Sequence, residues 1–175
     1  MRYTATARLL HWLTVALLLI LGSLGLWITR AEPADEEFKL KLYNIHESIG
    51  IAVFVLTVMR LAWRVAHPPP PLPADLAAVL RLAAHMTHAA LYALLLTMPV
   101  VGFLATNAWG FPLTWFGLVP IPSPIGRDET WAPILSAAHG WMALALAGLV
   151  ALHAGAALWH HLVRRDDTLR RMLPG

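Results

Sequence analysis

The sequence contains no cysteine, and only 13% of its 175 residues are charged. The lack of cysteine excludes disulfides, cysteine-ligated iron–sulfur clusters and thiolate zinc sites. A soluble domain carries about a quarter charged residues, so this composition, which is 58% hydrophobic, is that of a membrane protein. What is abundant is histidine, with nine copies, and tryptophan, with eight. The histidines are therefore the first candidates for a functional site.

Four apolar runs are long enough to cross a bilayer, which takes about 20 helical residues. They cover approximately residues 9–29, 44–66, 85–106 and 134–163. The connecting segments are short, so we predict a single domain over residues 1–175, an all-α integral membrane four-helix bundle without a soluble catalytic domain. The first run also resembles a signal peptide followed by "RAEPA" as a cleavage region. It is longer than a usual signal-peptide core, and we expect it to be retained as a helix.

The basic residues predict that both termini are cytoplasmic. In this orientation nine arginines lie inside: Arg2, Arg8, Arg60, Arg64, Arg81, Arg164, Arg165, Arg170 and Arg171. Four basic residues lie outside: Arg30, Lys39, Lys41 and Arg127. This distribution follows the positive-inside rule. Seven of the ten acidic residues also lie outside: Glu32, Asp35, Glu36, Glu37, Glu47, Asp128 and Glu129.

Four histidines inside the apolar runs are predicted to pair by depth. His139 and His153 are almost four helical turns apart, so they share a face and are separated by about 21 Å along the helix axis. Polar side chains in a membrane face the bundle interior. Because consecutive helices enter from opposite sides, His11 meets His153 in the inner half and His46 meets His139 in the outer half. Two facing imidazoles without a carboxylate are what bis-histidine haem b requires.

Glycines and arginines extend the faces that carry these histidines. The glycines are Gly22 and Gly25 in the first run and Gly50 in the second. Glycine lets a flat macrocycle approach the backbone. Arg60 and Arg64 follow His46 on its helix face, so Arg60 is expected near the inner haem and Arg64 near the inner mouth, where arginines would bind haem propionates. Anchoring of the two arginines by snorkelling is the alternative.

Histidines within a membrane can also serve purposes that need no haem. A single histidine can simply hydrogen-bond to a neighbouring helix. A transition-metal transport site is the second alternative, but such a site would recruit Asp, Glu or Cys deep inside the spans. Glu47 lies at the outer end of the second run, and no acidic residue lies deeper. Four histidines that pair by depth across three helices favour haem ligation.

Further histidines gather at the predicted inner end of the third and fourth helices: His85, His88, His160 and His161. Histidine titrates near neutral pH and passes protons, and a quinone that is reduced takes up protons with its electrons. We therefore interpret His88 and His160 as residues of a quinone or proton-delivery site. Interfacial anchoring is the alternative, above all for His85 and His161. The tail "RRDDTLRRMLP" suits contact with anionic lipid.

Several motifs resemble the bacterial cytochrome b561 family, in the same order along the chain. They are "LLHWLTVALLLILG", "NIHESIGIAVFVLTVMRLAWR", "AHMTHAALYALLLTMPVVG", "AAHG" and "ALHAGAALWHHLVRRDDTLRRMLP". The ending "WHH…DDTLRRMLP" is similar to the stand-alone superoxide-oxidase type. This resemblance implies a di-haem b protein of the bacterial inner membrane that oxidises periplasmic superoxide to oxygen and reduces ubiquinone. It implies four haem-iron ligands, His11, His46, His139 and His153, and quinone-side roles for His88 and His160.

A superoxide oxidase needs a positive entrance for its anionic substrate. Lys39 and Lys41 are the predicted entrance residues, although four basic and seven acidic residues give the outer side a net charge of −3. The expected partners are superoxide, a membrane quinone and the lipid bilayer, with no nucleic acid and no obligatory protein partner. The alternative function is a cytochrome b electron-transfer subunit that links a dehydrogenase or hydrogenase to the quinone pool.

Overall fold

The computed structural model describes residues 2–30, 35–73 and 75–173. Its elements are α1 (Ala5–Arg30), α2 (Glu36–Ala66), α3 (Ala78–Ala108), β1 (Thr114–Trp115), β2 (Val119–Pro120), α4 (Trp131–Trp159) and the π-helical turn η1 (His160–Arg164). Four helices, the last continuing into η1, are long and apolar enough to cross a membrane. The predicted four-helix membrane architecture is confirmed. Residues 31–34, which include Glu32 and most of the segment "RAEPA", lie outside the described residues.

The second helix extends beyond its apolar run because a polar residue caps its start. The second helix begins at Glu36, eight residues before the apolar run. Asp35 is its N-cap, and the Asp35 carboxylate accepts hydrogen bonds from the backbone N–H groups of Glu37 and Phe38 at 2.9 and 3.1 Å. Acidic residues in the first turn also interact favourably with the helix dipole. Hydropathy alone therefore locates the membrane-crossing part of the helix and misses its outer two turns.

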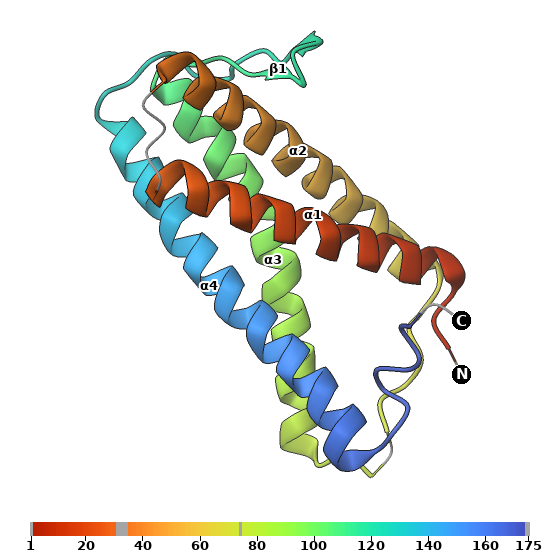
Figure 1. The fold of residues 1–175 in the computed structure, drawn as a ribbon. Coiled ribbons are helices and arrows are strands. Elements are labelled where there is room, and N and C mark those ends of the chain that lie inside the picture. The colour runs from red at the N-terminus through yellow and green to blue at the C-terminus, as the bar shows by residue number, and fades with distance from the viewer. Residues whose placement is uncertain (1, 31–34, 74, 174–175) are drawn as a thin grey trace.

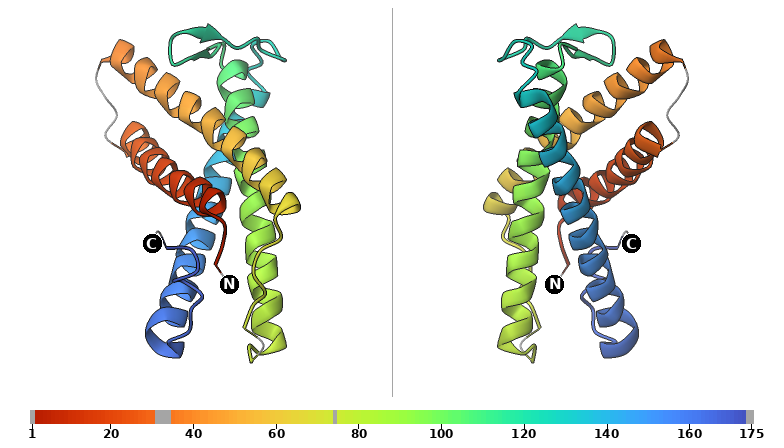
Figure 2. Two further views of the ribbon diagram at one scale, coloured as in Figure 1. Left: turned by 90° about the vertical axis from the view of Figure 1, so that its right-hand side faces the viewer. Right: turned by 90° about the vertical axis from the view of Figure 1, so that its left-hand side faces the viewer.

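The four helices pack as two pairs that are joined on one side (Figure 1). Helix α1 packs against α2, α3 packs against α4, and α2 also packs against α3. Among the described residues, α4 makes no comparable backbone contact with α1 or α2. Two views from the sides show α1 and α2 inclined away from the α3–α4 pair (Figure 2). The space between α4 and the helices α1 and α2 is therefore wider than the space between directly packed helices. Side chains of α4 must cross this space to reach α1 and α2.

A small apolar core occupies the middle of the bundle. Its buried members are Val53, Leu95 and Leu146, and partly buried leucines and a methionine of α1 and α3 pack around them. Leu146 lies midway in sequence between His139 and His153, seven residues from each. Most other long apolar side chains stay exposed, as a lipid-facing surface requires. The core thus lies between the level of His139 and the level of His153 in the bundle.

The two ends of the chain meet at the same end of the bundle (Figure 1). The Trp12 Nε1–H group of α1 donates to the Met172 carbonyl at 2.8 Å. The Arg8 guanidinium donates to the Leu173 carbonyl, also at 2.8 Å. The C-terminal tail therefore folds back against the start of α1.

The opposite end of the bundle carries a β-hairpin in the α3–α4 connection. Strands β1 and β2 pair antiparallel, and positive φ angles at Phe116 (48°) and Gly117 (72°) form the turn that suits a tight hairpin. Three hydrogen bonds hold the hairpin on α2. Ser48 Oγ accepts from the Phe116 N–H, the Ser48 carbonyl accepts from Trp115 Nε1, and the Asn44 side chain donates to a β1 carbonyl.

Candidate functional site

Histidines from three helices form two ring pairs at different levels of the bundle. The rings of His11 on α1 and His153 on α4 have centroids 6.3 Å apart and planes inclined at 74°. The rings of His46 on α2 and His139 on α4 also have centroids 6.3 Å apart, with planes at 73°. We call the first the inner pair and the second the outer pair. The structure thus brings together the histidines whose depths match.

The centroid separation in both pairs suits one metal ion between two rings. An imidazole nitrogen binds a transition metal at about 2 Å and lies about 1.2 Å from its ring centre, so opposed axial ligands have centroids roughly 6 Å apart. Among the residues that the structure describes, no group of three or more metal-ligating side chains is assembled. Each pair therefore has the ring spacing that two axial histidine ligands of a haem b require.

Glycines of neighbouring helices lie against both rings of the outer pair. A Cβ atom built on Gly102 of α3 would be 2.9 Å from Cε1 and Nδ1 of His139. A Cβ on Gly25 of α1 would be 3.3 Å from Cε1 of His46. The predicted haem-environment residue Gly50 instead faces space, with no atom within 4 Å of a Cβ placed there. At Gly25 and Gly102, the outer rings therefore lie directly against the helix backbone, because glycine has only a hydrogen atom in place of a side chain.

Titratable and cationic side chains lie on one side of the inner pair, near His153 and Tyr92. The His88 ring lies 5.3 Å from the His153 ring, centroid to centroid. The guanidinium carbons of Arg60 and Arg64 lie 5.6 and 6.0 Å from the Tyr92 ring centre. Neither arginine forms an ion pair with any acidic residue in the described part of the chain. Two half-buried cations without acidic partners fit the propionate groups of a haem.

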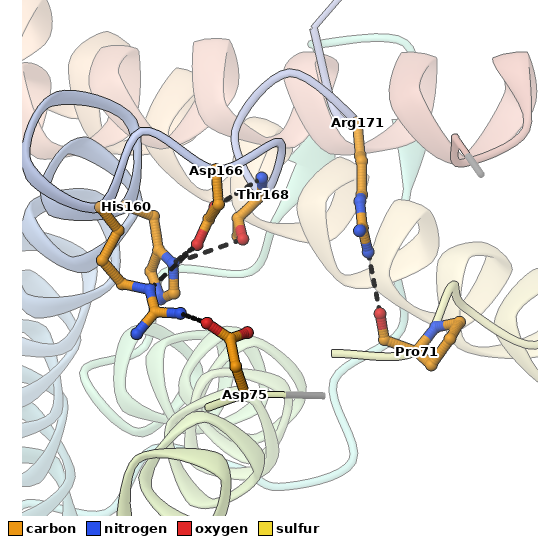
Figure 3. Close-up of polar contacts among 7 residues, drawn as sticks. Pro71, Asp75, His160, Asp166, Thr168 and Arg171 are labelled. Atoms are coloured by element: carbon orange, nitrogen blue, oxygen red, sulfur yellow. Dashed lines mark hydrogen bonds and ion pairs between the residues drawn. The ribbon is translucent and has the colours of Figure 1, made fainter. Parts of the chain in front are cut away.

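A polar network closes the inner end of α4 (Figure 3). His160 Nδ1 donates to Asp166 Oδ2 at 2.6 Å, and Arg164 Nε donates to the same oxygen at 3.2 Å. The second oxygen, Asp166 Oδ1, accepts from the Thr168 N–H at 2.9 Å. Arg164 also pairs with Asp75 of the α2–α3 connection at 2.6 Å. The network ties the end of α4 both to the tail and to the loop before α3.

The backbone after α4 explains how Asp166 reaches His160. The π-helical turn η1 widens the last turn, and Arg165 adopts a left-handed conformation with a φ of 55°. Burial opposes ionisation of Asp166, but hydrogen bonds from Thr168, His160 and Arg164 hold the pKa of this carboxyl below its usual range. A carboxylate on Nδ1 fixes the proton there and leaves Nε2 of His160 available as an acceptor.

The two predicted quinone-side histidines belong to different groups. His88 contacts the inner pair through His153, whereas His160 bonds to Asp166 near the tail. The predicted superoxide-entrance residues also have acidic neighbours. Three of the four outer basic residues lie beside a carboxylate: Lys39 with Glu36 at 3.9 Å, Lys41 with Glu37 at 2.7 Å and Arg127 with Glu129 at 3.0 Å. Such pairs leave only a weak local positive field.

Sequence patterns do not point to Gly102 or Asp166, although both contact a predicted site residue. Helix α3 contributes no member of either histidine pair, so no spacing from a ligand leads to Gly102. Asp166 lies six residues after His160 in a charged tail. The one signal for it in the sequence is the combination of a histidine, an aspartate and a basic residue within a short segment.

Comparison with known proteins supports the interpretation of this geometry. The family model described as prokaryotic cytochrome b561 matches residues 2–175. Cytochrome b561 homolog 2 of Escherichia coli K12 is 36% identical over 98% of this chain and 91% of its own length. Cytochrome b561 homolog 1 of the same organism is 31% identical over 99% and 97%. A probable superoxide oxidase, CybB of Yersinia pestis, is 32% identical over 94% and 92%. The resemblance predicted from the motifs is confirmed, and the chain belongs to the prokaryotic cytochrome b561 family of multi-pass membrane electron-transfer proteins, which implies haem b.

Proposed function

We propose that this protein oxidises superoxide at its outer end and reduces ubiquinone at its inner end. Two haems b would be held between these ends, one by His46 and His139 and one by His11 and His153. The observation that carries the proposal is the 6.3 Å centroid separation in both histidine pairs. The similarity to the probable superoxide oxidase of Yersinia pestis supports the choice of electron donor.

The overall reaction balances over two turnovers at the outer end. Two superoxide anions each lose one electron and leave as oxygen, and one ubiquinone takes up two electrons and two protons to become ubiquinol. When bound, the haems would supply the one-electron path between these reactions. The chain itself sets the two ligand levels about 21 Å apart along α4. It fills the space between them with the apolar core around Val53 and Leu146.

The inner end supplies the protons that ubiquinol formation consumes. His160 would hold a proton within reach of a quinone oxygen, and Asp166 fixes the orientation of its ring. His88, beside the inner pair, is the second titratable side chain on this side. Arg60 and Arg64 would bind the propionates of the inner haem. These roles assign His88 and His160 to proton delivery and Arg60 and Arg64 to cofactor binding.

The proposal also includes an orientation and a location. Residues 1–175 form one di-haem domain in the bacterial inner membrane, with both termini cytoplasmic and the outer pair towards the periplasm. The distribution of arginines supports this orientation through the positive-inside rule. The contact of the C-terminal tail with the start of α1, which brings both termini to one end of the bundle, is consistent with it. Superoxide would then react outside, and protons would be taken from the cytoplasm.

A visible spectrum with haem quantification tests the haem assignment. The purified protein is expected to contain about two haems b per chain and to show the Soret band of low-spin, bis-histidine haem. Enzymatically generated superoxide should then produce the reduced haem band and, with a soluble ubiquinone analogue, ubiquinol. Added superoxide dismutase should abolish both signals. A protein without a Soret band contradicts the whole proposal.

One observation favours a second function, an electron-transfer subunit for a dehydrogenase or hydrogenase. The outer basic residues lie beside carboxylates, so the outer end has little to attract an anion. Such a subunit would keep both haems and the quinone site. It would be reduced by a small-molecule donor such as dithionite and remain oxidised in the presence of superoxide.

A further inference from the structure

The two histidine pairs differ in the hydrogen bonding of their rings. His139 Nδ1 lies 3.2 Å from the backbone carbonyl of Met98 on α3. The Nδ1 atoms of His11 and His46 are buried without a hydrogen-bond partner. Within the described residues, His139 is the member of the two pairs that donates to a backbone carbonyl. This bond leaves Nε2 as the nitrogen that is free to bind a metal.

The close approach of His139 to α3 depends on Gly102. Gly102 lies four residues after Met98, about one helical turn further along the same face. A Cβ atom at Gly102 would come within 2.9 Å of both Cε1 and Nδ1 of His139, whereas carbon atoms in contact are normally about 3.5–4 Å apart. Any side chain at this position would push the ring away from the Met98 carbonyl.

We propose that the Met98 carbonyl and Gly102 together orient His139 and lower the reduction potential of the outer haem. The inference rests on the proposed haem ligation by His139. Gly102 and Met98 act through that ligand, so they are positioning residues and touch neither substrate.

The direction of the effect follows from the hydrogen bond. A backbone acceptor on Nδ1–H makes the imidazole a stronger electron donor through its other nitrogen. A stronger donor stabilises ferric iron relative to ferrous iron, which lowers the potential. Around the inner pair, the positive charges of Arg60 and Arg64 favour the reduced state instead. The two environments would thus give the outer haem a lower potential than the inner haem, the order that favours electron transfer towards the quinone.

Substitution of Gly102 tests this arrangement, with a second glycine as control. In Gly102→Ala the added methyl group displaces the His139 ring. In Gly148→Ala the methyl group meets no atom within 4 Å. Gly148 lies nine residues after His139 on α4, about two and a half turns along the helix and therefore on the opposite face. Each variant is purified, its haem content per chain is measured, and both haems are titrated potentiometrically by their visible bands.

The expected result is specific to one haem. Gly102→Ala should keep the inner haem, which shows that the variant is folded. It should either lose the outer haem or show an upward shift of the outer potential alone. Gly148→Ala should match the wild type. The proposal is overturned by a Gly102→Ala protein with both haems and unchanged potentials, or by equal changes in the two variants.

If Gly102→Ala contains no haem, a second measurement tests whether the outer haem has the lower reduction potential. His153→Ala is expected to retain only the outer haem and His139→Ala only the inner one. The potential of the haem in His153→Ala should be the lower of the two, and the reverse order overturns the inference. A wild-type protein with two haems but this reversed order leaves the proposed function standing. A wild-type protein without haem removes the proposed function and this inference with it.

Discussion

The outer histidine pair is enclosed by backbone, whereas charged and titratable side chains lie on one side of the inner pair. At the outer level, Gly25 and Gly102 bring helix backbones against both rings, and the hairpin is bonded to Ser48, two residues after His46. At the inner level, the His88 ring lies against His153, and Arg60 and Arg64 lie beside Tyr92, one helical turn after His88. Ring geometry is nearly identical in the two pairs.

Under the proposed function, the surroundings of each histidine pair, and not its ring geometry, distinguish the two sites. A site that accepts electrons from a small anion needs a fixed ligand and no proton. A site that reduces a quinone needs groups that carry protons and balance charge. The backbone enclosure of the outer pair and the polar surroundings of the inner pair match these two demands. Four experiments test this contrast, in order of decreasing expected effect.

Removal of one inner ligand should affect one level only. His153→Ala is expected to lose the inner haem, to keep a reducible outer haem and to reduce quinone at least about 100-fold more slowly, since loss of a direct ligand exceeds the usual effect of its supporting residues. Haem quantification and quinol formation measure both effects. If His153→Ala retains two haems, the ligand pairs are assigned wrongly.

Loss of the Asp166 carboxylate should affect proton delivery and spare haem reduction. Asp166→Asn is expected to slow quinone reduction about 10-fold, because the His160 ring loses the group that fixes its orientation. Reduction of the haems by superoxide should remain unchanged. The matched control is Asp167→Asn, whose carboxylate is exposed and lies 3.9 Å from Arg170. Equal rates in the two variants would show that Asp166 has no role at the quinone site.

The same carboxylate should make stability depend on pH. Its pKa is lower in the folded protein than the usual value of about 4, so at acidic pH the unfolded chain binds more protons and stability falls as pH falls. The contribution is fully present above about pH 5 and amounts to about 2 kcal/mol at most. Thermal unfolding in detergent between about pH 3 and pH 6, a range that brackets the usual carboxyl pKa, should show a steeper acid loss for wild type than for Asp166→Asn. Parallel curves would indicate that the tail network contributes no stability.

Charge reversal at the predicted superoxide entrance should have the smallest effect. Lys39→Glu with Lys41→Glu is expected to slow superoxide oxidation about 2- to 3-fold at low ionic strength and hardly at all in high salt. The effect is small because Glu36 and Glu37 already offset these lysines. Arg170→Glu, at the other end of the bundle, is the control. A salt-independent rate in the double variant would place the entrance elsewhere.

The sequence predicts the architecture well and the supporting contacts poorly. Four apolar runs suffice for four membrane helices, and a fourteen-residue spacing with antiparallel order suffices to pair His11 with His153 and His46 with His139. Ligation of haem by these residues stays a prediction. The contact between Gly102 and His139 depends on how α3 and α4 are rotated and how closely they approach, which helical periodicity does not specify.

Local backbone geometry accounts for the other gaps. The bond from His160 to Asp166 needs the π-helical turn and the left-handed Arg165, and hydropathy contains no signal for either. The pairing of Lys41 with Glu37 at a four-residue spacing is predictable on a helix. The net charge of the outer loops, in contrast, does not reveal this ion pair. Summed charge and apolar length thus describe the membrane placement of the chain, while individual contacts require its coordinates.

The hydrogen bonds from Arg8 and Trp12 to the last described residues have a consequence for biosynthesis. A ribosome releases α1 well before the tail, so these contacts form only after the tail has emerged. The outer pair is complete once His139 has been synthesised, whereas the inner pair also needs His153. The order of synthesis therefore completes the outer pair before the inner pair, and the contacts of the tail with α1 form last.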